Sequence, residues 1–426
     1  MKQSIRSLVG GGLAGVAILA AGLAGGAAQA QDKAPIKAAT LLDFTRVYTF
    51  LTDEYSQGQQ DYIKLLNMEG GIDGHPVELI VRDQGSQPQQ GIALYNQARD
   101  EGAIFFDFLS TPVANAVMPR ANEDHLPMMT FAHGRADAID GKLFPFVFPS
   151  AAIYRSQAAL LLKYMDEHVG GLKDKKIAFV HIDSPFGREP IALLEAMAKT
   201  KGFTLKTFPY AVPGTEQSAA WTDVRRFRPD QVIIWGAGPG QAVSVRGAIS
   251  NGISPKSIYS VIWLSETDMR SFQGDAVVGV KRFTAVNTGA DSAILKRISE
   301  KVVAAGKGTG DAKVVGSTYY NIGVATMAIM AQAAKQALAD QGEPLTGDKL
   351  KAGFEKIKDF DAEGLMPALT ITADDHQGGG WGRVSEWDGS KWVPLNDWGH
   401  AYQDVIWGLV REDAAKAAKA AQETKK

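Results

Sequence analysis

The feature that most constrains the fold is a regular alternation of short apolar runs with helical stretches between residues 36 and 263. The apolar runs, such as "AIFFDFL" (103–109) and "KKIAFV" (175–180), are almost continuously hydrophobic. Such runs are typical of strands buried on both faces, and strands that alternate with helices form parallel sheets. The pattern therefore predicts an α/β fold.

The hydrophobic pattern also gives approximate limits for each element. The predicted strands span 36–44, 75–83, 103–109, 127–132, 175–182, 203–210, 230–235 and 257–263. The predicted helices span 53–71, 87–102, 112–125, 151–168, 187–201, 216–227, 240–250, 292–305, 316–340 and 347–358. The segment "SEWDGSKW" (385–392) predicts a hairpin with Asp-Gly at its turn. Because the alternation is too long for one sheet, we predict two Rossmann-like lobes.

The first thirty residues are typical of an export signal. Lys2 and Arg6 precede a small-residue apolar stretch that ends in Ala28-Gln29-Ala30, a small-x-small cleavage site. A membrane anchor is the alternative, but the stretch is Gly/Ala-rich and no second long apolar run follows. The chain has no Cys, so neither a lipid anchor nor disulfides are expected. We expect cleavage after Ala30 and release into the periplasm.

Composition and motifs exclude several function classes. Loss of the signal would take the formal net charge from −2 to −4, and no basic stripe suits nucleic acid. The Gly-rich segment "GAGPGQ" (236–241) lacks dinucleotide-binding spacing, and no nucleophile elbow or H-E-x-x-H motif occurs. The polar cluster Asp374, Asp375 and His376 lies near a Gly-rich turn and is expected to be solvated. We therefore expect no cofactor, no metal and no enzymatic activity.

Four motifs in a characteristic order carry a family resemblance. They are "GQQDYIKLLNMEGGIDGHPVELIVRDQGSQPQQGIALYNQA" (58–98), "DSPFGRE" (183–189), "RPDQVIIWG" (228–236) and "YYNIGVATMAIMAQA" (319–333), with Asn321 where an acid is usual. Together they resemble type I periplasmic solute-binding proteins of the branched-chain amino-acid (Leu/Ile/Val) ABC transporter family. The resemblance covers nearly the whole mature chain, from about Ile36 to about Val393.

The resemblance implies how the two lobes are joined and divided. Hinge crossovers are expected near residues 149–154, 284–287 and 364–367, and the lobes should close around a small solute. The expected divisions are 31–150 with 287–364 as the first lobe, 151–286 with 365–410 as the second, and 411–426 as a flexible Ala/Lys tail.

Two loops of the first lobe are candidates for carboxylate binding. Ser110 and Thr111 offer hydroxyls at the start of a helix, whose free N–H groups attract anions, although a plain N-cap is the alternative. In the family this loop holds the ligand carboxylate. The loop with Thr130, Ala132 and His133 is the second candidate, and its Arg135 would either pair with a carboxylate or be solvated.

The second lobe is expected to set the ligand class. Tyr154 falls where amino-acid binders of the family carry an Asp for the α-ammonium, which leaves only Glu266 as an acid. Because a buried charge needs a partner, this arrangement weakens the case for an α-amino acid. Phe186, Trp235 and Trp263 end second-lobe strands and, with Tyr48, would give the cleft aromatic walls.

Three functions remain open on this reasoning. The first is a monomeric periplasmic protein that binds a small, carboxylate-bearing, branched or aromatic solute and delivers it to an inner-membrane ABC permease. The second is a periplasmic sensor of the same fold that feeds a membrane receptor. The third is a hydrolase, for which His133 near Ser110 is the only candidate pair.

Overall fold

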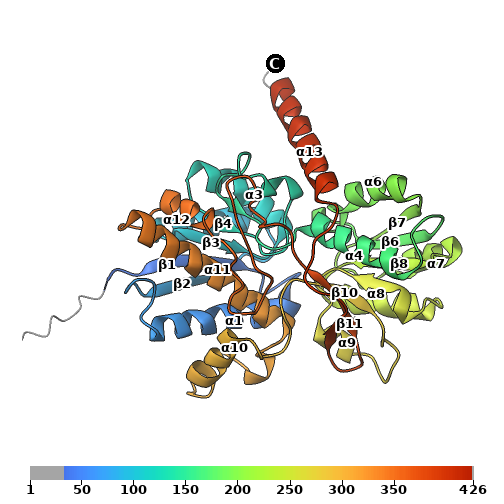
Figure 1. Cartoon of the computed structure of the whole chain (residues 1–426), viewed down its shortest axis with the longest axis horizontal. Helices are drawn as coiled ribbons and strands as arrows, with labels where there is room; N and C mark the ends of the chain where they lie inside the picture. The colour runs from blue at the N-terminus through green and yellow to red at the C-terminus, as the bar shows by residue number, and fades with distance from the viewer. Residues whose placement is uncertain (1–32, 425–426) are drawn as a thin grey trace, which may run out of the picture.

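The computed structural model describes residues 33–424, so the expected export signal lies outside the described residues. The chain forms two α/β lobes side by side, each built on a mainly parallel sheet, and both the α/β class and the two-lobe arrangement are confirmed (Figure 1). Among the described residues, no helix combines the length and the apolar character needed to cross a bilayer.

The first lobe has an entirely parallel five-stranded sheet in the order β2-β1-β3-β4-β5. Its strands are β1 (Ile36–Leu42), β2 (Val77–Asp83), β3 (Phe105–Phe108), β4 (Met128–Met129) and β5 (Val147–Phe148). Neighbouring residues of one strand enter separate cores, because Phe105 and Phe106 point to opposite faces of the sheet. The helices of this lobe are α1 (Thr49–Met68), α2 (Pro88–Asp100), α3 (Thr111–Glu123), α10 (Ala293–Ile298), α11 (Thr318–Gln341) and α12 (Gly347–Phe354).

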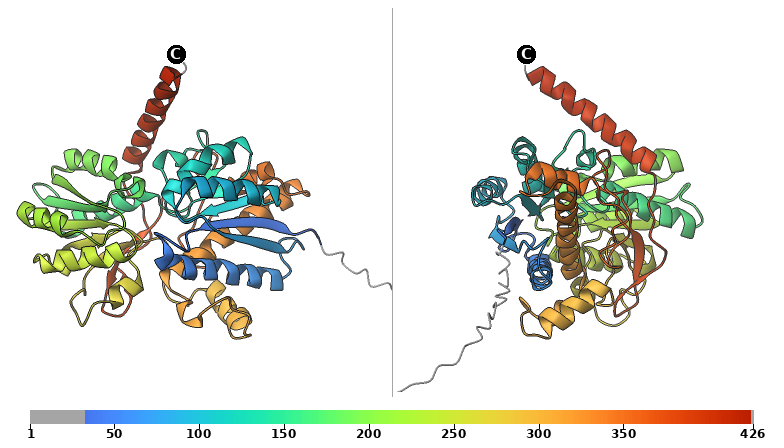
Figure 2. Two further views of the ribbon diagram at one scale, coloured as in Figure 1. Left: turned by 180° about the vertical axis from the view of Figure 1, so that it is seen from behind. Right: turned by 60° about the vertical axis from the view of Figure 1, so that its left-hand side comes forward.

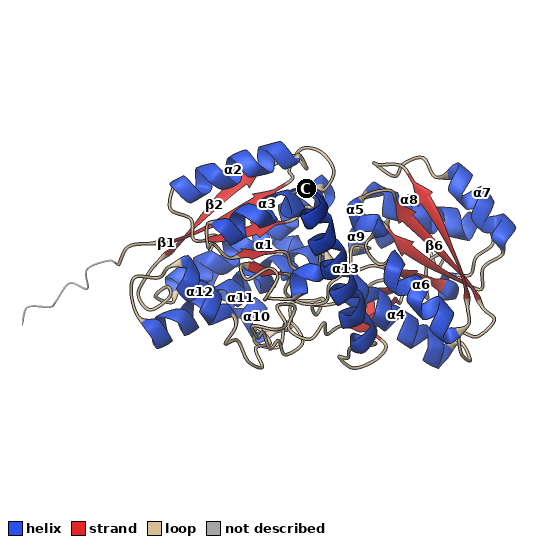
Figure 3. Ribbon diagram, turned by 90° about the horizontal axis from the view of Figure 1, so that it is seen from above, coloured by secondary structure: helices blue, strands red, loops and turns tan. Residues whose placement is uncertain are grey.

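Helices α1 and α11 pack closely on one face of this sheet, while α2 and α3 cover the other face (Figure 3). A Cβ atom on Gly58 would lie 2.1 Å from the Tyr320 carbonyl oxygen, and one on Gly323 would lie 2.1 Å from that of Tyr55. Only glycine permits this approach, which gives a physical reason for Gly58 in the first of the family motifs.

The second lobe has a seven-stranded sheet in the order β12-β11-β10-β9-β8-β6-β7. Its strands are β6 (Lys176–Ile182), β7 (Thr204–Tyr210), β8 (Gln231–Trp235), β9 (Ile258–Ser260), β10 (Lys281–Thr284), β11 (Arg383–Trp387) and β12 (Trp392–Pro394). The predicted Asp-Gly hairpin is confirmed, since β11 and β12 pair antiparallel with Trp387 opposite Trp392. The helices of this lobe are α4 (Tyr154–His168), α5 (Pro185–Arg188), α6 (Ile191–Lys201), α7 (Ser218–Phe227), α8 (Pro239–Ser250) and α9 (Glu266–Arg270).

Several elements differ from the sequence prediction. Strands β4 and β9 are shorter than predicted, and β5 and β10 were not predicted, because runs of two to four residues carry little periodicity. The C-terminal segment forms a helix, α13 (Gln403–Thr424), which projects away from both lobes (Figure 2). The N-terminal part of α13 contacts α4 and α6 as well as the first-lobe turn at Ala136–Ile139.

The predicted limits of the lobes stay a prediction, although the contacts of one segment bear on them. Leu369 pairs with Phe360, and the His376 N–H donates to the Ile139 carbonyl. The His376 ring stacks on Phe148, with 4.2 Å between ring centroids. Residues 369–376 therefore pack on the first lobe, and His376 is buried rather than solvated as expected.

Candidate functional site

A small cavity lies between the lobes, where strands of both sheets end. Its free volume is about 10 Å³, room for about one water molecule, and it is lined by Tyr48, Leu51, Leu109, Thr111, His133, Tyr154, Ala237 and Trp263. This is the usual position for a ligand in open α/β sheets. A larger hollow of about 880 Å³ near Arg225, Arg226 and Arg228 is open to solvent and lies away from these strand ends.

The structure brings five of the predicted site residues to this cavity, namely Tyr48, Thr111, His133, Tyr154 and Trp263. Phe186 and Trp235 lie behind the cavity, because both rings pack against Tyr154 with centroid distances of 4.8 and 5.9 Å. The lining residues Leu51, Leu109 and Ala237 were not predicted. Their only sequence signal is a position shortly after a strand, which many residues share.

Tyr154 and Trp263 connect the second lobe to the first. The Trp263 Nε1–H donates to the Tyr154 hydroxyl at 3.1 Å, and the Tyr319 hydroxyl, on α11, donates to the Trp263 carbonyl at 2.7 Å. Burial raises the pKa of Tyr154 well above its ordinary value, so the phenol is neutral. This wall of the cavity therefore offers hydrogen bonds and apolar surface without charge.

The start of α3 supplies the first-lobe side of the site. Ser110 is the N-cap residue, but its side chain makes no capping hydrogen bond. Its hydroxyl is buried and has no partner in the described structure. Thr111 follows at the cavity. A free hydroxyl beside a helix N-terminus suits a carboxylate, as the sequence predicted.

The loop after β4 is held tightly by its own hydrogen bonds. The Thr130 hydroxyl donates to the His133 carbonyl at 3.0 Å. The Ala132 N–H donates to the Ser150 carbonyl at 2.9 Å, and the Ala132 carbonyl accepts from Gln157 at 2.8 Å. Thr130 and Ala132 therefore position the loop, and neither lines the cavity.

Arg135, at the end of this loop, is not available for a ligand carboxylate. Its guanidinium makes two hydrogen bonds to Asp137 and lies over the Phe144 ring, 5.0 Å from the centroid. Neither of the two sequence interpretations of Arg135, a ligand contact or a solvated residue, describes this ion pair, in which Asp137 is buried and Arg135 is partly exposed.

His133 is buried against the cavity, and its Nε2 lies 2.7 Å from the Phe108 carbonyl oxygen. Burial lowers the pKa of His133 to about 4, so the ring is neutral at pH 7. Its Nδ1 has no partner among the described residues. Ser110 and His133, the pair that the sequence offered for a hydrolase, are not hydrogen-bonded to each other in the described structure.

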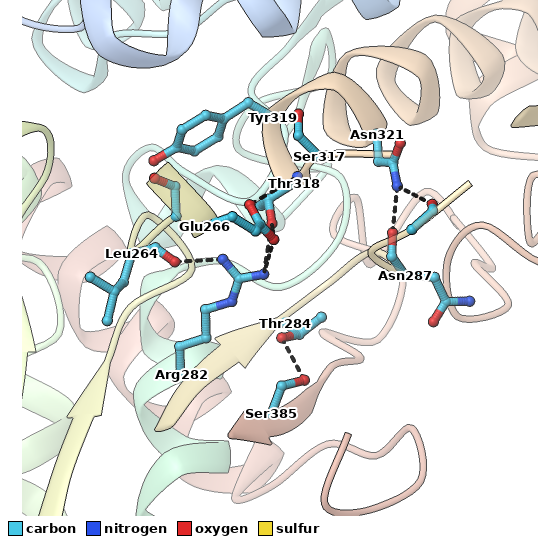
Figure 4. Close-up of polar contacts among 12 residues, drawn as sticks. Leu264, Glu266, Arg282, Thr284, Asn287, Ser317, Thr318, Tyr319, Asn321 and Ser385 are labelled. Carbon is cyan, nitrogen blue, oxygen red and sulfur yellow. Dashed lines mark hydrogen bonds and ion pairs between the residues drawn. The ribbon is translucent and has the colours of Figure 1, made fainter. Parts of the chain in front are cut away.

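Glu266 is engaged elsewhere and does not line the cavity (Figure 4). The Thr318 hydroxyl donates to its Oε1 at 2.7 Å, and the Arg282 guanidinium lies 3.5 Å from the same oxygen. Arg282 is fully buried and also donates to the Leu264 carbonyl. The acid expected to face an α-ammonium therefore neutralises a buried arginine and links α9 to α11.

Comparison with known proteins gives a consistent family assignment. The profile of the periplasmic binding protein family matches residues 35–391. The "Leu/Ile/Val-binding protein homolog 3" of Brucella melitensis is 24% identical over 43% of this chain. The match covers 49% of that relative, so the chain spans about half the length of the curated relative it matches.

Solved structures match over most of their length. A crystal structure described as an ABC transporter permease from the Pseudomonas fluorescens group has a TM-score of 0.84 and 32% identity, covering 91% of this chain and 98% of that one. A solute-binding protein of an R. palustris ABC transporter, in complex with benzoate, has a TM-score of 0.70 and 19% identity, covering 85% and 96%. The second likeness concerns the fold alone.

Proposed function

The chain belongs to the periplasmic binding protein family, and from this premise we propose that it is the solute-binding component of an ABC importer. The observation that carries the proposal is the cavity between the lobes, lined by Thr111 and His133 from one lobe and by Tyr154 and Trp263 from the other. A ligand held from both sides stabilises the closed form, which is how such a protein signals that it is loaded.

The proposed ligand is a small carboxylate-bearing solute, branched or aromatic, without an α-amine. The start of α3 would hold the carboxylate through Thr111, which lines the cavity, and through the unpaired hydroxyl of the preceding residue, Ser110, which does not line it. Tyr48, Tyr154 and Trp263 would cover the apolar part. No acidic side chain lines the cavity, and Glu266 already neutralises Arg282. An α-ammonium would therefore be buried without a counter-charge, which is costly.

The proposed setting follows from the family and the sequence. The signal peptide would be cleaved after Ala30, and the mature protein would act as a periplasmic monomer. Its partner would be an ABC permease in the inner membrane. The permease would accept the closed, ligand-bound form of the protein, and this step would set the specificity of transport.

The test compares acids with the amino acids of the same side chain. The mature protein, refolded to remove carried-over ligand, is titrated calorimetrically with isovalerate and valine, and with 3-phenylpropanoate and phenylalanine. We expect each acid to bind at least about tenfold more tightly than its amino-acid partner, since one uncompensated charge costs more than 1.4 kcal/mol. Tighter binding of valine or phenylalanine would contradict the proposed ligand class.

A further inference from the structure

His133 carries an unpaired hydrogen-bonding atom at the cavity wall. Its Nε2 contacts the Phe108 carbonyl oxygen, which can only accept, so Nε2 must carry the hydrogen. In a neutral imidazole the other nitrogen then has a lone pair and no hydrogen. Nδ1 is therefore an acceptor, and it is buried without a partner in the described structure.

The neighbouring side chains do not satisfy this acceptor. The Trp263 Nε1–H is bound to the Tyr154 hydroxyl, and the Thr130 hydroxyl is bound to the His133 carbonyl. The Ser110 hydroxyl is also unpaired, so it is not bonded to Nδ1. A buried acceptor left without a donor is unfavourable, so the atom requires a donor from the occupant of the cavity.

We propose that the solute carries a hydrogen-bond donor, a hydroxyl or an amide N–H, that binds Nδ1 of His133, in addition to its carboxylate. This inference rests on the proposed function and narrows its ligand class to hydroxy or amido acids. The cavity has a free volume of about 10 Å³, room for about one water molecule, so a solute of even a short chain or a single ring can enter only when the lobes separate.

Water does not remove this selectivity. A water molecule can donate to Nδ1 in the ligand-free cavity, but a ligand that displaces it without replacing its hydrogen bond loses affinity. A site built to bind a hydroxyl discriminates against the analogue that lacks one because its own polar atom is left unpaired. The expected preference is about 10- to 100-fold.

The first test compares a parent acid, its hydroxy acids and their methyl ethers in each of two series. The aromatic series is benzoate with each hydroxybenzoate isomer and each methoxybenzoate isomer. The branched series is isovalerate, 2-hydroxyisovalerate and 2-methoxyisovalerate. We expect at least one hydroxy acid to bind about 10- to 100-fold more tightly than both its parent and its methyl ether, because the ether keeps the oxygen but loses the donor.

Two variants of His133 separate the acceptor from the structural hydrogen bond. His133→Gln places an amide nitrogen near the position of Nε2, so it keeps a donor for Phe108 and loses the acceptor at Nδ1. His133→Asn places its amide group near Nδ1, so it can keep an acceptor there and loses the bond to Phe108. We expect the preference for the hydroxy acid to disappear in His133→Gln and to persist in His133→Asn, even if the latter melts at a lower temperature.

A measurement without ligand tests the tautomer directly. In ¹⁵N-histidine-labelled protein, with His133 assigned by its absence in His133→Gln, we expect Nδ1 to resonate as an unprotonated imidazole nitrogen at pH 7. A protonated Nδ1 overturns the inference, as does equal binding of parent, hydroxy acid and ether. Failure of every acid to bind overturns the proposed function together with this inference, whereas equal binding leaves the proposed function intact.

Discussion

The cavity differs in its charge from a second polar region between the same two lobes, which is partly exposed. This region, the Arg155 cluster, consists of Arg135, Asp137, Arg155, Glu189 and Asp413. The cavity is lined by neutral side chains, whereas the cluster is made of oppositely charged side chains in ion pairs.

The Arg155 cluster joins three parts of the chain. Arg155, in the first turn of α4, donates to Asp413 of α13 at 2.6 Å and lies 3.4 Å from Glu189. Glu189, which follows α5, also accepts the Ala136 N–H of the first lobe at 3.1 Å. The cluster therefore ties both lobes to α13 beside the cavity, but one Glu189 oxygen and two Arg155 nitrogens still lack hydrogen-bond partners.

Adjacent residues at the start of α4 contribute to these two different regions. Tyr154 and Arg155 are neighbours at the start of α4, yet their side chains diverge because successive helical residues are about 100° apart. Tyr154 faces the cavity, and Arg155 enters the cluster. Paired charges are expected to hold the closed form, while unpaired neutral atoms are left for the ligand.

The largest expected effect is on the cluster. Arg155→Met removes the cation between Glu189 and Asp413, and leaving buried carboxylates uncompensated should lower the free energy of unfolding by about 3–5 kcal/mol. Urea denaturation at pH 7.5 measures the change. The matched control is Arg226→Met, which breaks an exposed pair with Asp223 and should cost at most about 1 kcal/mol. Equal losses in both variants would show that the cluster is not structural.

The second prediction concerns the pH dependence of the cluster. Burial raises the pKa of Glu189 from 4.5 to about 7, so the folded protein binds a proton more readily than the unfolded chain. Wild-type stability should therefore fall as the pH rises from about 4.5 to 7, by at most about 3 kcal/mol from this group. In Glu189→Gln this contribution should vanish, and the variant should gain stability relative to wild type as the pH rises. If the stabilities of wild type and Glu189→Gln changed in parallel with pH, this prediction for Glu189 would be wrong.

The third prediction concerns His133 at the cavity, whose effect on stability should change with pH in the opposite direction to that of Glu189. Because the pKa of His133 is lowered from 6.5 to about 4, the unfolded chain binds the proton more readily there. The contribution of His133 should be complete above pH 6.5 and be lost as the pH falls toward 4, again by at most about 3 kcal/mol. Relative to His133→Gln, which keeps a donor for Phe108, wild type should lose stability on acidification. If wild type instead lost stability relative to His133→Gln as the pH rises, as is expected for Glu189, the proposed contrast between cavity and cluster would be wrong.

The smallest effect on stability is expected at Ser110. Ser110→Ala removes a buried hydroxyl that has no partner, so the free energy of unfolding should change by less than about 0.5 kcal/mol. Affinity for the carboxylate ligand should fall by about 1–2 kcal/mol, because a hydrogen bond to a charged group is lost. Calorimetric titration and urea denaturation of the same sample separate the two effects. A large loss of stability without a loss of affinity would make Ser110 structural.

The local sequence pattern was enough to predict the two lobes and the loops that meet at the cavity. The alternation of elements predicted the two lobes, and the position of loops after strands brought Tyr48, Thr111, His133, Tyr154 and Trp263 to one cavity. The lobes were predicted correctly, and these residues converge because parallel strands end at the same edge of a sheet. That they contact a ligand stays a prediction.

The remaining features were decided by tertiary structure. Glu266 was predicted as a ligand acid, but its partners Arg282 and Thr318 lie 16 and 52 residues away along the chain. Phe186 and Trp235 ended behind Tyr154 because ring packing set their place. Hydrophobic periodicity describes neighbours within a few residues, whereas the partner of a buried charge or ring is chosen by the folded chain. The sequence by itself therefore determined where the site lies, and only the tertiary structure decided which of its atoms are free to bind.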